Sequence, residues 1–200
     1  MTVHDRNAPP FNARVTPALS MAELRDLVGE AMQLTGWLET PAPPAALRWI
    51  ETFVEAYAER LETVADAIPL VAALRAEAVV VPALALERLR TRQVLFFLDT
   101  VSQYVDDQPE LRGLALDADI ATLAAEFGIA EADARWAVRV ALTGREDGPP
   151  LGALFVLLGH DRIMMRIGAV NSHVLHGRGL EPIAYGPGGV PFETIPAHKP

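Results

Sequence analysis

The sequence contains no cysteine and a single lysine, Lys199, next to its C-terminus. Without cysteine the chain cannot form disulfides, thiolate zinc sites or cysteine nucleophiles. No apolar run approaches the roughly 18 residues that a membrane-spanning helix needs, and the first residues, MTVHDRNAPPFN, contain no apolar segment of a secretory signal. From these absences we expect a cytoplasmic protein. The start methionine and a distinctive tail favour a complete short chain.

Acidic residues outnumber basic ones, 26 to 17, so the net charge is −9. This excess disfavours non-specific binding to nucleic acids. All basic residues except Lys199 are arginines. An arginine-only set is typical of GC-rich genomes, but arginine is also the better side chain for bidentate phosphate contacts and for stacking on bases. The charge alone therefore leaves RNA binding open.

Apolar residues recur at helical spacing along most of the chain, and convincing strand-type alternation is absent. Ser20 and Glu23 form a capping box, which predicts the start of the first helix, and Gly36 predicts its end. The pattern predicts an all-α protein with helices over 20–36, 44–68, 69–77, 82–106, 117–127, 131–143, 149–158 and 161–176.

A linker with a proline and a glycine, residues 108–116, suggests a division of the chain into two helical subdomains. We expect an N-terminal arm at 1–19, a first subdomain at 20–108, a second subdomain at 109–177 and a tail at 178–200. The tail is rich in proline and glycine and shows no regular pattern. The predicted architecture is therefore a two-subdomain helical bundle.

The most distinctive segment is RVALTGREDGPPLGALFVLLGHDRIMMRI, residues 139–167. It resembles, without gaps, the C-terminal subdomain of bacterial glutamyl-tRNA synthetases, which are class I aminoacyl-tRNA synthetases. The matching positions are Arg139, Ala141, Leu142, Thr143, Gly144, Gly148, Pro149, Leu158, Gly159, Arg162 and Arg166. Upstream, FNARVTPALSMAELRDLVGEAMQLTGW and AERLETVADAI resemble the same family more weakly. Asp66 and Ala67 depart from the usual Glu and Leu. The resemblance covers about residues 11–170.

The resemblance implies the all-helical anticodon-binding (cage) domain of these enzymes, free-standing and without the catalytic half. The family holds ATP with a His-Ile-Gly-His-like turn and a lysine-containing loop, and a chain whose one lysine is Lys199 lacks that loop. We therefore expect no catalytic residue and no activity from this chain alone. Glutamate-tRNA ligase activity would require a separate catalytic subunit. We expect no cofactor.

Arg135, Arg139 and Thr143 are spaced four apart, which places them on one face of a helix. In the family this region faces the anticodon loop, so the resemblance implies that Arg139, Thr143, Gly144 and Arg145 contact its bases. Proteins read splayed bases by arginine stacking and by hydrogen bonds to base edges. Arg162 and Arg166 lie one turn apart and could hold the RNA backbone. The implied partner is a tRNA, namely tRNA(Glu).

Simpler readings stand beside this one. Glu131, Arg135 and Arg139 also form an i,i+4 ladder of a solvated helix face, and Gly144 could simply end a helix. Glu146 and Asp147 would repel phosphate. The three tryptophans, Trp37, Trp49 and Trp136, are expected in the core. The histidines His160, His173 and His176 lack an accompanying carboxylate cluster, so no metal site is expected. The alternative function is a repurposed helical scaffold or regulator that binds a protein partner through the tail.

Overall fold

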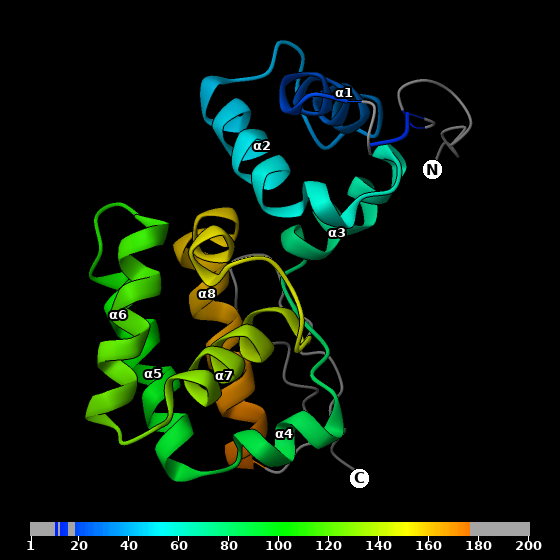
Figure 1. Ribbon diagram of the computed structural model, residues 1–200. Coiled ribbons are helices and arrows are strands. Elements are labelled where there is room, and N and C mark those ends of the chain that lie inside the picture. The colour runs from blue at the N-terminus through cyan, green and yellow to red at the C-terminus, as the bar shows by residue number, and fades with distance from the viewer. Residues whose placement is uncertain (1–10, 12, 16–18, 177–200) are drawn as a thin grey trace, which may run out of the picture. The chain divides into compact units, whose positions relative to one another are not determined.

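The computed structural model describes residues 11, 13–15 and 19–176. Within these residues the protein is all helical, and its only β-type pairing is an isolated bridge between Arg14 and Thr63 (Figure 1). The prediction of an all-α fold is confirmed. The helices are α1 (Met21–Leu34), α2 (Pro44–Tyr57), η1 (Ala58–Arg60), η2 (Val64–Asp66), α3 (Ala67–Arg75), α4 (Ala83–Leu89), α5 (Arg92–Asp106), α6 (Gly113–Glu126), α7 (Glu131–Thr143) and α8 (Leu151–His176), where η denotes a 3-10 helix.

The chain divides into two compact units. Unit 1 comprises residues 1–75, 112–115 and 149–158, and unit 2 comprises residues 76–111, 116–148 and 159–200. The helices α6 and α8 each contribute residues to both units. The two subdomains that the sequence suggests, divided at residue 108, stay a prediction. All residues of the predicted RNA site that the resemblance names belong to unit 2.

Helix α1 of unit 1 begins at the predicted capping box. The Glu23 amide donates to Ser20 Oγ at 3.3 Å, and the Ser20 amide donates to the Glu23 carboxylate at 2.8 Å. These hydrogen bonds lower the pKa of Glu23, the side-chain bond to Ser20 first. Helices α1, α2 and α3 then bury their apolar faces against one another, and the arm adds two buried side chains. The core includes Phe11, Val15, Val28, Ala31, Phe53, Val54 and Val71.

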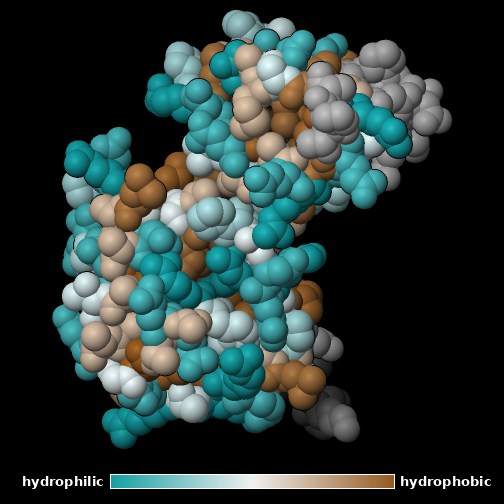
Figure 2. Space-filling model, in the orientation of Figure 1, coloured by the Kyte–Doolittle hydropathy of each residue, from teal (hydrophilic) through white to brown (hydrophobic). Residues whose placement is uncertain are grey.

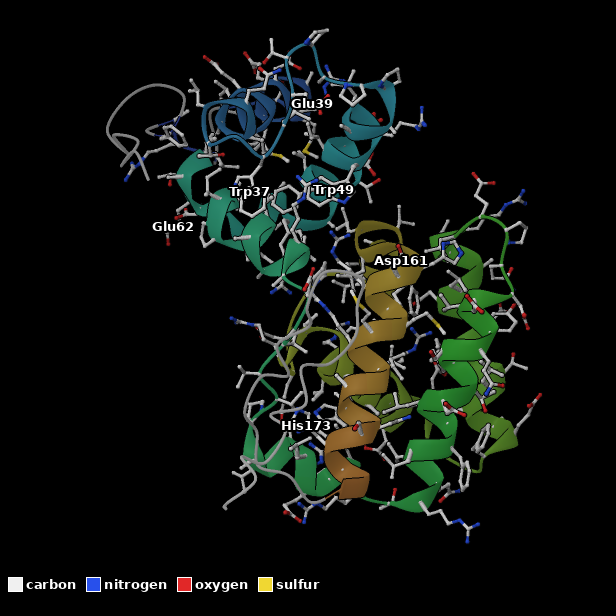
Figure 3. All side chains as sticks on the ribbon, turned by 180° about the vertical axis from the view of Figure 1, so that it is seen from behind. Trp37, Glu39, Trp49, Glu62, Asp161 and His173 are labelled. Atoms are coloured by element: carbon white, nitrogen blue, oxygen red, sulfur yellow. The ribbon has the colours of Figure 1, made fainter. Side chains whose placement is uncertain are left out.

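The tryptophans of unit 1 differ in their surroundings (Figure 3). Trp49 stacks on Phe53 at 5.5 Å between ring centroids, and its indole N–H donates to the Leu157 carbonyl at 2.9 Å. Trp37 is 37% exposed and lies under the Arg75 guanidinium, 5.6 Å from the ring centroid. The expectation of a core position is therefore wrong for Trp37, because an arginine rather than the core covers its ring.

Two helices of unit 1 approach each other through glycines. A Cβ atom built on Gly113, at the start of α6, would lie 2.3 Å from the Gly152 carbonyl oxygen. A Cβ built on Gly152, near the start of α8, would lie 2.5 Å from the Gly113 carbonyl oxygen. The backbones therefore touch where side chains would normally separate them. Both segments that meet here, 112–115 and 149–158, belong to unit 1.

The core of unit 2 is formed by apolar faces of α5, α6, α7 and the later part of α8 (Figure 1). Its fully buried side chains include Phe97, Leu98, Val101, Val138, Ala141, Leu142 and Ile163. Helix α8 is interrupted at Gly159, whose φ is 72° and ψ is 168°. This kink agrees with the predicted end of one helix at 158 and the start of another near 161.

Several predicted helix boundaries are wrong. The predicted helix over 82–106 is two helices, because Thr91 caps α5 by accepting a hydrogen bond from the Val94 amide at 3.3 Å. The predicted helix over 44–68 ends at Tyr57 and continues as 3-10 turns. Helix α6 begins at Gly113 rather than near Asp117, whose side chain pairs with an arginine instead of capping.

The face of the protein in Figure 2 carries mostly hydrophilic and weakly polar residues, with hydrophobic residues in smaller patches. None of the helices in the described part of the chain is both long enough and apolar enough to cross a membrane.

Candidate nucleic-acid interface

The site predicted from the sequence lies at the C-terminal end of α7. Helix α7 ends at Thr143, and Gly144 adopts the left-handed conformation with φ of 68°. A Cβ built on Gly144 would lie 2.2 Å from the Val80 carbonyl oxygen. Both the backbone conformation and the close approach therefore require glycine here. The simpler reading of Gly144 as a helix end accounts for the residue fully.

Thr143 closes the same turn. Its hydroxyl donates to the Arg139 carbonyl at 2.8 Å and accepts a hydrogen bond from the Arg145 amide at 3.1 Å. This arrangement ends the helix and turns the chain outward at Arg145. The Arg145 side chain is 69% exposed, and its guanidinium grips the Asp147 carboxylate with two hydrogen bonds of 3.0 and 3.3 Å. An exposed pair of this kind contributes at most about 1 kcal/mol, so a phosphate could compete for the arginine.

Arg139 lies over the same loop. A Cβ built on Gly148 would come within 2.9 Å of Arg139 Nη1, so the glycine leaves room for the guanidinium. Arg139 is half-buried. The structure thus brings three of the predicted residues, Arg139, Thr143 and Arg145, together around one tight turn and its following loop.

Arg135, one turn earlier on α7, is held by acids. Its Nη1 lies 2.6 Å from the Asp117 carboxylate, and its Nε lies 2.7 Å from the Glu131 carboxylate. The hydrogen bond to Glu131, together with Asp117, raises the pKa of Arg135 further above its ordinary value. The side chain is 31% exposed. The i,i+4 ladder reading therefore describes the Arg135–Glu131 contact, while Asp117 adds a tertiary ion pair from α6.

The two arginines of α8 occupy different environments. Arg162 is half-buried. Arg166 is only 1% exposed, and its guanidinium donates to the Leu142 carbonyl at 2.6 Å and to the Ala76 carbonyl. It thereby ties α8 to the last turn of α7 and to the segment before α4. This burial leaves Arg166 without the exposed guanidinium that the expected phosphate contact needs, and its role is to hold the interior of unit 2.

Arg88 on α4 is a member of this region that the sequence analysis missed. Its guanidinium lies over the Trp136 ring, 3.7 Å from the centroid, and approaches the carboxylates of Asp133 at 3.7 Å and Glu146 at 3.9 Å. Arg88 therefore offsets part of the negative charge of the loop. No local pattern pointed to it, because the contact joins residues that are distant in the chain. The half-buried Trp136 rests under this arginine.

Within the described part of the chain, no group of three or more acidic or histidine side chains is arranged to hold a metal ion. His160 contacts the Gln108 carbonyl at 2.7 Å, and Asp161 and His173 project from separate turns of α8 (Figure 3). The site is thus built from arginine, threonine and glycine on a helical frame. Such groups can contact phosphates and base edges.

An all-helical fold that presents arginines at the end of one helix is consistent with a helical RNA-binding domain. The chain matches the anticodon binding domain family over residues 21–170 and belongs to this family. Membership supports binding of a tRNA anticodon in general. A search of curated proteins gives no match.

Proposed function

We propose that the protein binds the anticodon region of a tRNA, specifically tRNA(Glu), through the end of α7 and the loop that follows. The observation that carries this proposal is the family match over residues 21–170, which includes the whole of this turn. Arg139, Thr143, Gly144 and Arg145 are the proposed contacts. The specificity for glutamate rests on the resemblance of residues 139–167 to glutamyl-tRNA synthetases.

Each contact has a distinct part in this proposal. Arg145 is the most exposed of them and reaches a base edge or a phosphate once its carboxylate partner yields. Arg139 lies over Gly148 and supports a base from the inner side of the loop. Thr143 and Gly144 fix the turn, so that the two guanidinium groups stay close to each other. Arg135 and Arg162 are outer contacts of the same proposal.

The acidic loop residues set the strength of this binding. Asp147 already occupies the Arg145 guanidinium, and Glu146 faces Arg88. Phosphate must therefore displace one carboxylate and tolerate the other. We expect a smaller number of phosphate contacts, and a weaker salt dependence, than in a strongly basic RNA-binding domain.

The test is binding of labelled tRNA(Glu) and of a non-cognate tRNA at two salt concentrations. We expect cognate-selective, salt-sensitive binding that Arg139→Ala or Arg145→Ala weakens by about 1–3 kcal/mol. Arg48→Ala is the matched control, because Arg48 is an exposed arginine on α2 of unit 1. Thermal unfolding of each variant separates a lost contact from a lost fold.

Unchanged binding in both α7 variants would contradict the assignment of these residues. Absence of binding to either tRNA at low salt would contradict the proposal itself. The latter result would favour the alternative function, a helical scaffold that binds a protein partner. The tail at 178–200, which that alternative uses, lies outside the described residues.

A further inference from the structure

A second arginine-lined surface of unit 2 is formed by residues outside the α7 turn and its loop. It is an open groove of about 710 Å³ between the start of α5 and the later part of α8, lined by Arg90, Arg92, Leu95, Phe96, Asp99 and Asn171 among others. Figure 3 shows α5 and the later part of α8 side by side. Its volume suits a small planar group with a few polar substituents.

The groove presents an aromatic side chain to solvent. Phe96 is 50% exposed and lies on the solvent-exposed face of the amphipathic helix α5, together with Arg92 and Asp99. The Arg92 guanidinium lies 5.2 Å from the centroid of its ring. The guanidinium covers part of the ring, and the side chain as a whole remains half exposed. Exposed aromatic rings flanked by arginine are the means by which proteins stack unpaired bases.

Arg92 differs from the other arginines of unit 2 that have acidic neighbours. No carboxylate of the described residues lies within ion-pair distance of its guanidinium, whereas Arg90 beside it pairs with Glu87 at 3.0 Å. Arg92 is also the first residue of α5, where the helix dipole disfavours positive charge. A positive charge at a helix N-terminus costs stability, and such a cost is expected where function requires the charge.

Two side chains give the groove hydrogen-bonding capacity. Asp99 lies one turn after Phe96 and offers a carboxylate that can accept from a base amino group or a ribose hydroxyl. Asn171 on α8 donates to the Leu95 carbonyl at 3.5 Å, and its Oδ1 has no hydrogen-bond partner among the described residues. The exposed Arg92 guanidinium complements a phosphate, and the exposed Phe96 ring complements a base.

We propose that this groove binds one unstacked nucleotide of single-stranded RNA. The base stacks on Phe96, Arg92 contacts the adjoining phosphate, and Asp99 accepts a hydrogen bond from the base or the ribose. The choice of RNA as ligand rests on the proposed function. The residues that line the groove are different from the residues of the α7 turn and its loop.

The experiment uses the full chain and fluorescently labelled single-stranded RNA of about six nucleotides, within the site size of single-strand binders. One oligonucleotide of each base composition is titrated at two salt concentrations. We expect Phe96→Leu and Arg92→Ala each to weaken binding about tenfold, and Phe96→Trp to retain it. Arg48→Ala, an exposed arginine of unit 1, is the control and should bind like the unaltered chain.

A second readout locates the contact. An oligonucleotide carrying 4-thiouridine should crosslink, on irradiation, to the peptide that contains Phe96. Crosslinking only to the α7 loop, or equal affinity of Phe96→Leu and the unaltered chain, would overturn the inference. A groove that binds a peptide or protein and not the oligonucleotide would likewise overturn the inference.

The tRNA titrations distinguish this inference from the proposed function. If the groove variants bind the oligonucleotide normally while tRNA binding still depends on Arg139 and Arg145, only the groove assignment fails. If oligonucleotide binding depends on Phe96 while Arg139→Ala and Arg145→Ala bind tRNA normally, the groove stands and the α7 assignment fails. Binding of neither RNA contradicts both.

Discussion

Arg145 and Arg166 belong to the same stretch of resemblance and to the same unit, yet they lie in opposite environments. The Arg145 guanidinium is mostly exposed and grips a neighbouring carboxylate, whereas the Arg166 guanidinium is enclosed and bonds to two backbone carbonyls. Arginine is suited to both positions because its planar group donates several hydrogen bonds at fixed angles. A matching residue in a sequence pattern can therefore serve the interior as readily as the ligand.

This contrast separates the residues that support the α7 turn from the residues that it exposes to a ligand. The buried arginine donates to the Leu142 carbonyl in the last turn of α7, where carbonyl groups lack partners within the helix, and to the Ala76 carbonyl after α3. The exposed arginine then projects from a turn that the interior already fixes. We call the buried support around Arg166 the frame, and the exposed side around Arg145 the contact surface. Substitutions in the frame should lower stability, and substitutions in the contact surface should weaken RNA binding.

The largest expected effect comes from removing the enclosed arginine. Arg166→Met should lower the free energy of unfolding by about 3–5 kcal/mol, because two carbonyl groups lose their charged donor. Chemical denaturation measures this change. Arg162→Met, on the same helix but half-buried, serves as the control and should cost less than about 1 kcal/mol. A loss below that value for Arg166→Met would show that its enclosure is not structural.

The next effect concerns the turn that joins frame and surface. Gly144→Ala should lower the free energy of unfolding by about 2–4 kcal/mol, since it adds a left-handed alanine and a clash with the Val80 carbonyl. Gly36→Ala isolates the first contribution, because Gly36 has φ of 77° with no atom within 4 Å of the added carbon. Equal losses in the two variants, measured by denaturation, would mean that the clash relaxes without cost.

On the exposed side, Asp147→Asn should strengthen tRNA binding by about 0.5–1 kcal/mol. The substitution removes a negative charge and releases the Arg145 guanidinium from this carboxylate. Titration at several salt concentrations should also give a steeper salt slope, as expected when another phosphate contact forms. Glu110→Gln provides a charge-matched control outside the loop. If both variants bind alike, net charge rather than the Arg145 pair governs affinity.

An effect of similarly small size is expected for the half-buried pair of Tyr104 and Asp119. The Tyr104 hydroxyl donates to the Asp119 carboxylate at 2.6 Å, and this hydrogen bond raises the pKa of Tyr104 above its usual value of 10.0. Tyr104→Phe should therefore cost about 0.5–1 kcal/mol at neutral pH.

The pH dependence of this cost has a definite sign. A raised folded-state pKa contributes stability that is present below pH 10 and disappears as the pH rises through the folded-state value. The unfolding free energies of the unaltered chain and of Tyr104→Phe should thus converge in alkaline solution. A difference that persists there would mean that the ring packing, and not the hydrogen bond, was altered.

Local signals in the sequence predicted some elements well. The bounds of α7 and the capping box of α1 follow from side chains that act on their own turn, such as Ser20 and Gly144. The break before α5 was missed because a single cap, Thr91, interrupts an otherwise continuous apolar pattern. The enclosure of Arg166 and the contacts of Arg88 arise from segments distant in the chain, and helical spacing contains no information about them.

The contact between Gly113 and Gly152 has a consequence for how this chain can change over time. Most tight contacts tolerate a larger residue on one side if the other side becomes smaller. Here each position faces the other's backbone, and neither has a side chain left to reduce. No second substitution at the partner can compensate for the first. Each of the two glycines should therefore stay constant by itself, and the two positions should not covary. A search for covarying pairs of positions would not detect this contact.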